Sequence, residues 1–185
     1  MRHIPNLICL GRVALIWPVV RLLHGGRYEP ALALFVIAAL SDGLDGFLAK
    51  RYHWVSELGK VLDPAADKLL LVIVFVESAW LQLVPWWVTA AAVARDVMIG
   101  LGALIYRLWF GPLNGRPTVI SKLNTAAQLL YLALVMFAAA FLFPPPGVLR
   151  ALAYIVVVTT ALSGLKYLSS FTRRAWSAPA RVRAA

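Results

Sequence analysis

Long apolar stretches, separated by short polar or proline- and glycine-rich breaks, run through the whole of this chain. Each stretch is close to the roughly twenty residues that an α-helix needs to cross the hydrocarbon core of a bilayer. Gly25-Gly26 and Pro144–Gly147 are the clearest of the breaks. The pattern predicts six helical spans, at residues 4–24, 29–51, 60–82, 84–108, 118–143 and 147–170.

The composition agrees with a membrane protein. Of 185 residues, 62% are hydrophobic and only 14% are charged, which lies outside the usage of soluble globular domains. We therefore expect an all-α polytopic integral membrane protein, with a single membrane domain over residues 1–172 and a basic cytoplasmic tail over 173–185. We expect the first span to stay uncleaved. The one cysteine, Cys9, excludes an internal disulfide.

The net charge of +10 has a sided distribution. Basic residues fall mainly in the second and fourth breaks and in the tail: Lys50, Arg51, Lys60, Arg107, Arg116, Lys122, Arg173, Arg174, Arg181 and Arg183. By the positive-inside rule, this predicts both termini in the cytoplasm, in what we expect to be a bacterial inner membrane. A nucleic-acid surface is the rival interpretation. The tail lacks interleaved aromatic residues, so we expect no nucleic-acid partner.

Four of the eight acidic residues lie in one stretch between two apolar spans: Asp42, Asp45, Asp63 and Asp67. A carboxylate costs several kcal/mol at membrane depth. Two carboxylates about 4 Å apart repel by roughly 4 kcal/mol at an effective dielectric constant near 20. A cation in the cluster relieves both costs, and carboxylate oxygens are the ligands that Mg²⁺, Mn²⁺ and Ca²⁺ prefer.

The spacing of the aspartates supports a built site. Asp42 and Asp45 are three residues apart, and Asp63 and Asp67 are four apart, so each pair shares one face of a helix. Glycine and alanine residues around them leave room for a ligand or a second helix. The alternative is two acidic helix ends that are solvated and paired with nearby lysines and arginines. Solvated ends require neither fixed spacing nor glycines.

The full pattern is Asp42-x-x-Asp45-Gly46-x-x-Ala49-Lys50, then eight residues, then Gly59-x-x-x-Asp63-x-x-x-Asp67. It resembles the signature of the CDP-alcohol phosphatidyltransferases, which are membrane enzymes of phospholipid synthesis. The family usually has arginine where Lys50 stands, so a bidentate phosphate contact is lost or shifted to Arg51. The six-span layout resembles that family over essentially the full chain.

The resemblance implies a divalent-metal enzyme that transfers a phosphatidyl group from CDP-diacylglycerol to an alcohol and releases CMP. It implies Mg²⁺ or Mn²⁺, as two ions, held at the cytoplasmic membrane boundary by Asp42, Asp45, Asp63 and Asp67. Asp67 would also act as the catalytic base. The residues that would contact the CDP moiety are Asn6, Asp42, Gly46, Ala49, Lys50 and Gly59. For Asn6, a helix cap after Pro5 is the alternative.

Two further segments bear on the acceptor. Arg95 and Asp96 are charged residues within the apolar fourth span, where a structural ion pair is the alternative to a functional role. The predicted acceptor-binding residues are Arg95, Arg116, Lys122 and Asn124. The Arg95-Asp96 pair and the segment around Asn124 resemble the cardiolipin synthases of the family more than the phosphatidylglycerophosphate synthases. Phosphatidylglycerol is therefore the favoured acceptor, and glycerol 3-phosphate is the alternative.

Two rival functions use similar residues. A membrane prenyltransferase also binds a diphosphate through aspartates, but its two aspartate motifs lie far apart along the chain. An ion transporter would place its carboxylates near the bilayer midplane on broken helices, not at one edge. The run Ala138-Ala139-Ala140 suits close packing against a second copy, so a homodimer is a further expectation.

Overall fold

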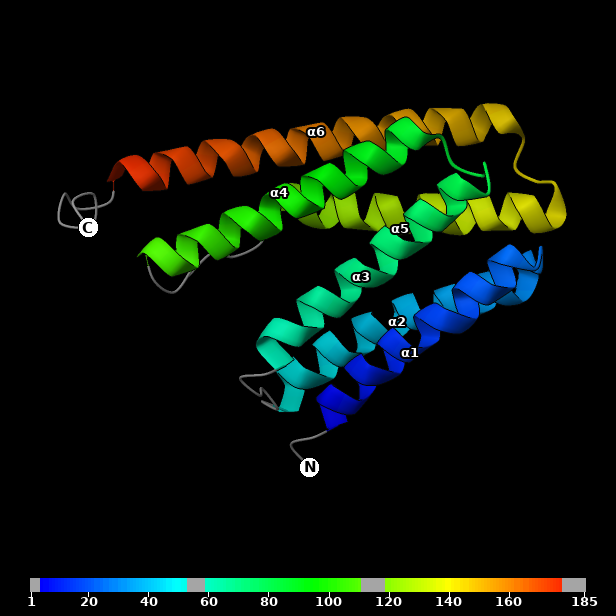
Figure 1. Ribbon diagram of the computed structural model, residues 1–185, viewed down its shortest axis with the longest axis horizontal. Coiled ribbons are helices and arrows are strands. Elements are labelled where there is room, and N and C mark those ends of the chain that lie inside the picture. Colours follow the sequence, from blue (N-terminus) through cyan, green and yellow to red (C-terminus); the bar gives the residue numbers. More distant parts are fainter. Residues whose placement is uncertain (1–3, 53–58, 111–118, 178–185) are drawn as a thin grey trace.

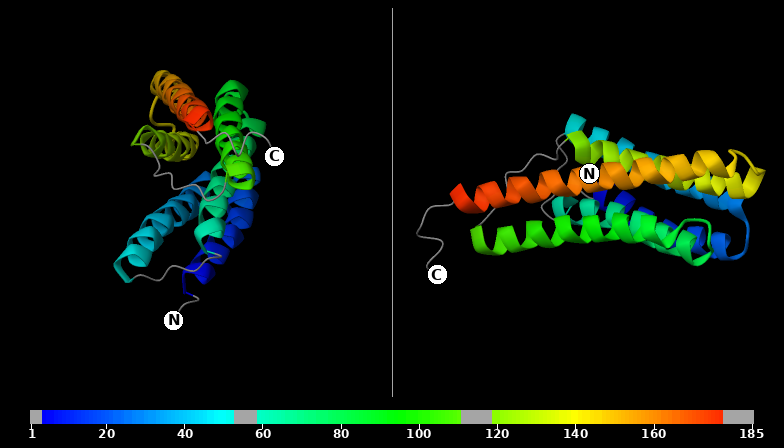
Figure 2. Two further views of the ribbon diagram at one scale, coloured as in Figure 1. Left: turned by 90° about the vertical axis from the view of Figure 1, so that its left-hand side faces the viewer. Right: turned by 90° about the horizontal axis from the view of Figure 1, so that it is seen from above.

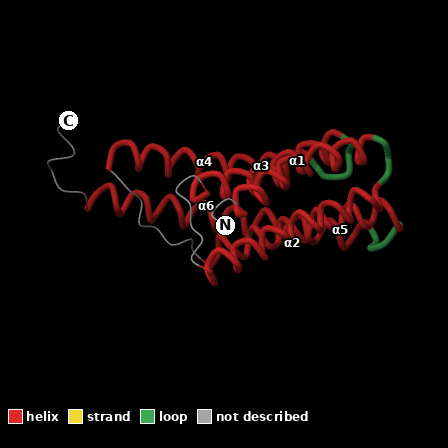
Figure 3. Tube along the Cα trace, turned by 90° about the horizontal axis from the view of Figure 1, so that it is seen from below, coloured by secondary structure: helices red, strands yellow, loops and turns green. Residues whose placement is uncertain are grey.

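The computed structural model describes the backbone of residues 4–52, 59–110 and 119–177, and the side chains of residues 11, 13–41, 68–102 and 119–169. The described residues form six α-helices and no strand (Figure 3). The helices are α1 (Ile4–His24), α2 (Tyr28–Tyr52), α3 (Gly59–Trp80), α4 (Trp86–Phe110), α5 (Val119–Phe141) and α6 (Pro146–Ser177).

The prediction of six helices is confirmed, and the first five begin and end within a few residues of the predicted spans. The main difference is α6, which continues to Ser177, past residue 170 where the predicted span ends. Arg173 and Arg174 therefore extend the helix, whereas the predicted tail was to begin at residue 173. Residues 178–185 lie outside the described part. The single-domain organisation and the basic tail stay predictions.

The helices form a closed ring (Figures 1 and 2). Neighbouring contacts run in the order α1, α2, α5, α6, α4, α3 and back to α1, and a weaker α3–α5 contact crosses the ring. Because consecutive helices alternate in direction, the ends at which α1 begins, α2 ends and α3 begins lie together. We call this end of the bundle the motif end, and the opposite end the turn end. The final turns of α4 and α6 and the start of α5 also lie at the motif end.

Short turns close the helices at the turn end. After α1, Gly26 adopts a φ of 66°, and the amide of Arg27 donates to the carbonyl of Leu22 at 2.9 Å. This is a Schellman cap, in which glycine takes the left-handed position without a Cβ penalty. The turn after α3 repeats the geometry with Gln82 at a φ of 59°, where a side chain is costlier.

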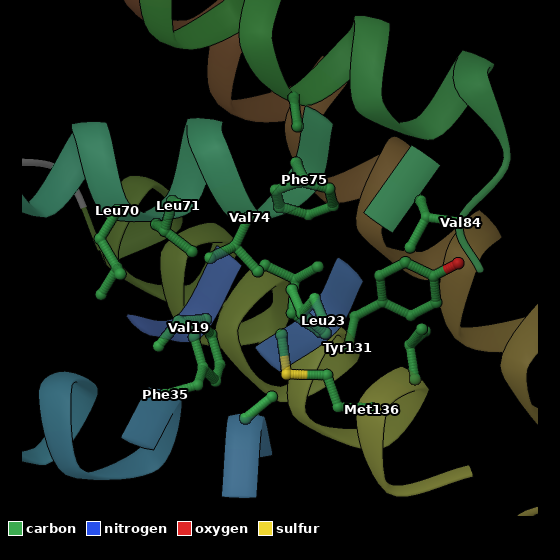
Figure 4. Packing of buried hydrophobic residues seen from close by; sticks show 14 of the residues in the cluster. Val19, Leu23, Phe35, Leu70, Leu71, Val74, Phe75, Val84, Tyr131 and Met136 are labelled. Atoms are coloured by element: carbon green, nitrogen blue, oxygen red, sulfur yellow. The ribbon is translucent and has the colours of Figure 1, made fainter. Parts of the chain in front are cut away.

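An apolar core fills the space between α1, α2, α3 and α5 (Figure 4). Val19 and Leu23 of α1 and Phe35 of α2 are at most 1% exposed, and they face the inward residues of α3 and α5. Phe75 and Tyr131 stack with their ring centroids 6.5 Å apart. Interdigitation of these side chains fixes how α1 sits against α2 and α3, the two helices that carry the aspartates.

The outer surface is apolar as well. On α6, the exposed large hydrophobic side chains that the structure describes are Val148, Tyr154, Ile155, Val158, Leu162, Leu165 and Leu168. The same helix buries Thr160 and Ser163. An apolar exterior over a polar interior suits a lipid surrounding. Within the described residues, Val119–Phe141 and Pro146–Ser169 are long and apolar enough to cross a membrane. The six-span topology stays a prediction.

Candidate active site

The two aspartate pairs lie on two helices that both reach the motif end and both pack against α1. Asp42 and Asp45 are in the second half of α2, and Asp63 and Asp67 are in the first turns of α3. Helical backbone at all four positions confirms the assumption behind the spacing argument, so each pair shares one helix face. Their side chains lie outside the described part, and their roles as ligands stay predictions.

The predicted CDP contacts fall on the same three helix ends. Gly46, Ala49 and Lys50 are in the last turns of α2, and Gly59 begins α3. Asn6 lies in the first turn of α1, which packs against both α2 and α3. The fold thus places residue 6, residues 42–50 and residues 59–67 at one end of the bundle. The side chains of these residues lie outside the described part, so their contacts with CDP stay predictions.

Arg95 is the most connected polar side chain that the structure describes. Its side chain is only 4% exposed. Nη1 donates to Asp96 Oδ1 at 2.6 Å, and Nη2 donates to Ser121 Oγ at 2.7 Å and to Ser163 Oγ at 2.5 Å. Because these partners lie on α4, α5 and α6, one guanidinium ties three helices together. Arg95 and Asp96 thus form an ion pair, which the sequence offered as the alternative to a functional role, and the functional role stays a prediction.

Lys68 extends this network to α3. Its Nζ donates to Asp96 Oδ1 at 2.7 Å, so one carboxylate oxygen accepts from both cations. The side chain of Asp96 is 6% exposed, whereas that of Lys68 is 38% exposed. Lys68 directly follows Asp67 in the chain. Together, Lys68, Arg95 and Asp96 carry one net positive charge.

Asn124 is fully buried between α5 and α6. Its Oδ1 accepts from Thr160 Oγ1 at 2.8 Å and lies 3.0 Å from Thr159 Oγ1. One turn further along α5, Gln128 is 1% exposed, and neither atom of its amide has a partner among the described residues. The structure therefore gives Asn124 an interhelical contact, and its predicted contact with the acceptor stays a prediction.

The other two predicted acceptor residues are Lys122 and Arg116. Lys122 is exposed in the first turn of α5. Arg116 lies in the segment 111–118, outside the described residues. We use the term polar layer for two hydrogen-bonded groups of buried and half-buried polar residues near the motif end: Lys68, Arg95, Asp96, Ser121 and Ser163 in one, and Asn124 with Thr160 in the other.

The donor set fits a divalent metal. Four carboxylates on two helix ends at the motif end supply hard oxygen ligands, and Lys68, which follows Asp67 in the chain, is already paired with a fifth carboxylate, that of Asp96. Lys68 is thus held toward α4. Among the side chains that the structure describes, no three metal-binding groups come together. The predicted ligands are not among those side chains.

Sequence reasoning missed several members of the polar layer. Ser163 and Thr160 lie three residues apart on α6, so they share a face of an otherwise apolar helix. That spacing was a usable signal. The pairing of Lys68 with Asp96 was not readable, because it depends on how α3 and α4 pack and joins residues 28 positions apart.

Comparison with known proteins gives the class. The profile of the CDP-alcohol phosphatidyltransferase family matches residues 2–163. The chain is 33% identical over 181 residues to the cardiolipin synthases (CMP-forming) of Rattus norvegicus and Homo sapiens, in alignments that cover 89% of this chain and 60% of each relative. This chain belongs to the CDP-alcohol phosphatidyltransferase family, as its signature suggested.

The relatives divide between two acceptors. The chain is 35% identical over 178 residues to the CDP-diacylglycerol–glycerol-3-phosphate 3-phosphatidyltransferase of Salmonella choleraesuis, covering 91% of this chain and 94% of that relative. By contrast, it spans only about 60% of the length of the rat and human cardiolipin synthases. Family membership is thus shown, while the acceptor is not fixed by similarity.

Proposed function

We propose that this protein transfers a phosphatidyl group from CDP-diacylglycerol to a glycerol-based alcohol and releases CMP. The observation that carries the proposal is the position of the signature. Both aspartate pairs lie on helical backbone at the motif end, on the end of α2 and the start of α3, and α1 packs against both of these helices. The family match over residues 2–163 supports the same chemistry.

The proposed reaction is a single displacement at phosphorus. The acceptor hydroxyl oxygen forms a bond to the β-phosphorus of the donor, while the bond from that phosphorus to the oxygen of the leaving CMP breaks. Asp67 accepts the proton of the hydroxyl group, which raises the nucleophilicity of the attacking oxygen. Gly46, Ala49 and Gly59 leave room for the cytidine and ribose, Asn6 contacts the nucleotide, and Lys50 offers its ammonium to the diphosphate.

Asp42, Asp45, Asp63 and Asp67 would hold the divalent metal. The chemistry supplied by bound Mg²⁺ or Mn²⁺ would be neutralisation of the charge that develops on the phosphate oxygens. Without a cation, the four carboxylates would repel both one another and the donor diphosphate. The choice between the two metals, and the presence of two ions, belong to this proposal.

Phosphatidylglycerol is the acceptor that we favour. Lys68, Arg95 and Asp96 together leave one positive charge, which balances the single charge of a phosphodiester. A phosphomonoester carries about −1.5 to −2 at neutral pH and would leave charge unpaired. Glycerol 3-phosphate is the second candidate, because the chain covers nearly the full length of the Salmonella relative that is named for it.

We also propose that all six helices lie in a bacterial inner membrane, with both termini and the motif end on the cytoplasmic side. The apolar exterior of α6 and the exposed tryptophans Trp80, Trp86 and Trp87 near the turn end support this placement, since tryptophan favours the membrane–water boundary. A homodimer through the alanine run of α5 stays a prediction.

An acceptor panel tests the proposed function. Purified protein would receive labelled CDP-diacylglycerol and Mg²⁺ with phosphatidylglycerol, glycerol 3-phosphate, inositol phosphate or serine. We expect cardiolipin and CMP from phosphatidylglycerol. Efficient synthesis of phosphatidylglycerophosphate without cardiolipin would overturn the acceptor assignment. Absence of CMP with every acceptor would overturn the transfer reaction itself.

A further inference from the structure

We infer that Lys68 is the cation that contacts a phosphate oxygen of the acceptor, and that Asp96, Arg95 and Ser163 hold it in place. This inference rests on the proposed function. Among the cations of the polar layer, Lys68 combines exposure with a fixed position. Its side chain is 38% exposed, yet its ammonium is anchored to Asp96 at 2.7 Å. An ammonium group has three N–H donors, so the bond to Asp96 leaves capacity for an anionic ligand.

Arg95 is poorly placed to touch a substrate. Its side chain is 4% exposed, and its two terminal nitrogens are committed to Asp96, Ser121 and Ser163. The guanidinium fixes Asp96, and Asp96 in turn fixes Lys68. Arg95 is therefore a positioning residue. The sequence predicted that Arg95 contacts the acceptor, and we assign this contact to Lys68 instead.

The packing of α6 against α4 supports the same chain of contacts, in which Arg95 holds Asp96 and Asp96 holds Lys68. A Cβ atom added at Gly164 would lie 3.3 Å from Met98 Cε and 3.9 Å from Arg95 Cγ, so α6 approaches the arginine closely at this point. That approach brings Ser163 Oγ within 2.5 Å of Arg95 Nη2. Ser163 thus connects the longest helix to a charge network that ends at Lys68 on α3.

The position of Lys68 favours the acceptor over the donor. It directly follows Asp67, which by our proposal takes the proton of the acceptor hydroxyl, and its side chain reaches toward α4. In the proposed function, the metal site and Lys50 bind the donor diphosphate. An acceptor of either kind, lipid phosphodiester or soluble phosphomonoester, brings a phosphate oxygen that one ammonium can bind.

The test compares KM values for the two substrates. Lys68→Met removes the charge and keeps most of the apolar stem. We expect KM for the acceptor to rise roughly ten- to a hundredfold, the usual worth of one charge-assisted hydrogen bond. KM for CDP-diacylglycerol should stay within about twofold of wild type on the same argument, since that contact is absent from donor binding. Both phosphatidylglycerol and glycerol 3-phosphate would be measured, and the rise is expected with whichever acceptor the wild-type enzyme uses.

Three further variants separate a contact from a structural role. Lys68→Arg keeps a cation and should restore acceptor KM to within about threefold of wild type, since both side chains bind phosphate. Asp96→Asn and Ser163→Ala leave Lys68 in the chain but loosen its anchor, so each should raise the same KM by less than Lys68→Met does. Lys166→Met, which removes an exposed cation of α6, is the matched control and should change neither KM.

The outcomes distinguish a failure of the inference about Lys68 from a failure of the proposed function. Gel filtration and thermal unfolding would select variants that fold. If wild-type protein releases no CMP with either acceptor, the proposed function fails. If wild type turns over but Lys68→Met leaves acceptor KM unchanged, or raises both KM values equally, the inference about Lys68 is overturned and the proposed function stands.

Discussion

The two halves of the helix ring bury opposite kinds of side chain. Between α1, α2, α3 and α5 the interior is almost wholly apolar, with Leu23, Phe35 and Met136 at most 1% exposed. Near the motif end, the interior between α4, α5 and α6 holds the polar layer, including a buried arginine, and Lys68 joins it from α3. The apolar half gains from packing alone, and the polar half gains only where every donor and acceptor is matched.

The difference shows which half is tied to chemistry. Ionisable groups at membrane depth are expensive, and a chain that needed only a stable bundle would gain more from apolar residues at those positions. Helix α5 belongs to both halves, and its buried face changes from polar to apolar along the helix. The buried residues are first Asn124 and Gln128, then Tyr131 and Val135. The polar part of that face lies toward the aspartate pairs.

The largest expected effect belongs to the predicted base. Asp67→Asn keeps the shape of the side chain and removes its proton-accepting capacity. We expect kcat to fall roughly 10²- to 10⁴-fold, the usual contribution of general base catalysis. Thermal unfolding should stay near wild type, because the substitution removes one charge from a group of carboxylates that repel one another. A variant that retains wild-type kcat would show that another group takes the proton.

A core substitution should do the reverse. Phe35→Ala empties part of the apolar half, and we expect it to lower the free energy of unfolding by about 3 kcal/mol, limited by the ability of lipid to solvate the separated helices. The folded fraction should keep both KM values. Ile37→Ala, at a position 52% exposed on the same helix, is the control and should change little. Equal losses in the two variants would contradict the assigned core.

Gln128 offers a smaller test of the polar half. Since neither amide atom has a partner among the described residues, Gln128→Met should raise the free energy of unfolding by about 1–2 kcal/mol, as removal of an unsatisfied buried amide does. Asn124→Leu should instead destabilise, because its Oδ1 accepts from Thr160. Chemical or thermal denaturation in detergent would measure both. A destabilised Gln128→Met would mean that the amide is satisfied by bound water.

The turn end should respond least. Gln82→Gly relieves a left-handed residue that is exposed, so it should stabilise by up to about 1 kcal/mol. Gly26→Ala places a Cβ on a φ of 66° and should destabilise by a similar amount. Thermal unfolding of the two variants side by side checks the prediction. Activity should follow the folded fraction in both.

The sequence predicts the helices better than the contacts between them. Apolar length and the glycine and proline breaks locate six helices, because those signals are local. The end of α6 was missed, since Ser170–Ser177 is polar enough to end a span yet stays helical. Local signals also bring the aspartate pairs to one end. They do not show that Arg95 joins Ser121 to Ser163, because that depends on the order of helices around the ring.

The central claim is that the aspartates of α2 and α3 carry out metal-dependent transfer. The most direct test measures the release of CMP from labelled CDP-diacylglycerol by wild type and by Asp63→Asn. Asp63 is the first aspartate of the second pair and is our choice for the least replaceable ligand. We predict CMP release by wild type with Mg²⁺, none with excess chelator, and none from folded Asp63→Asn at any metal concentration. Normal CMP release by Asp63→Asn, or by wild type in chelator, would contradict the account.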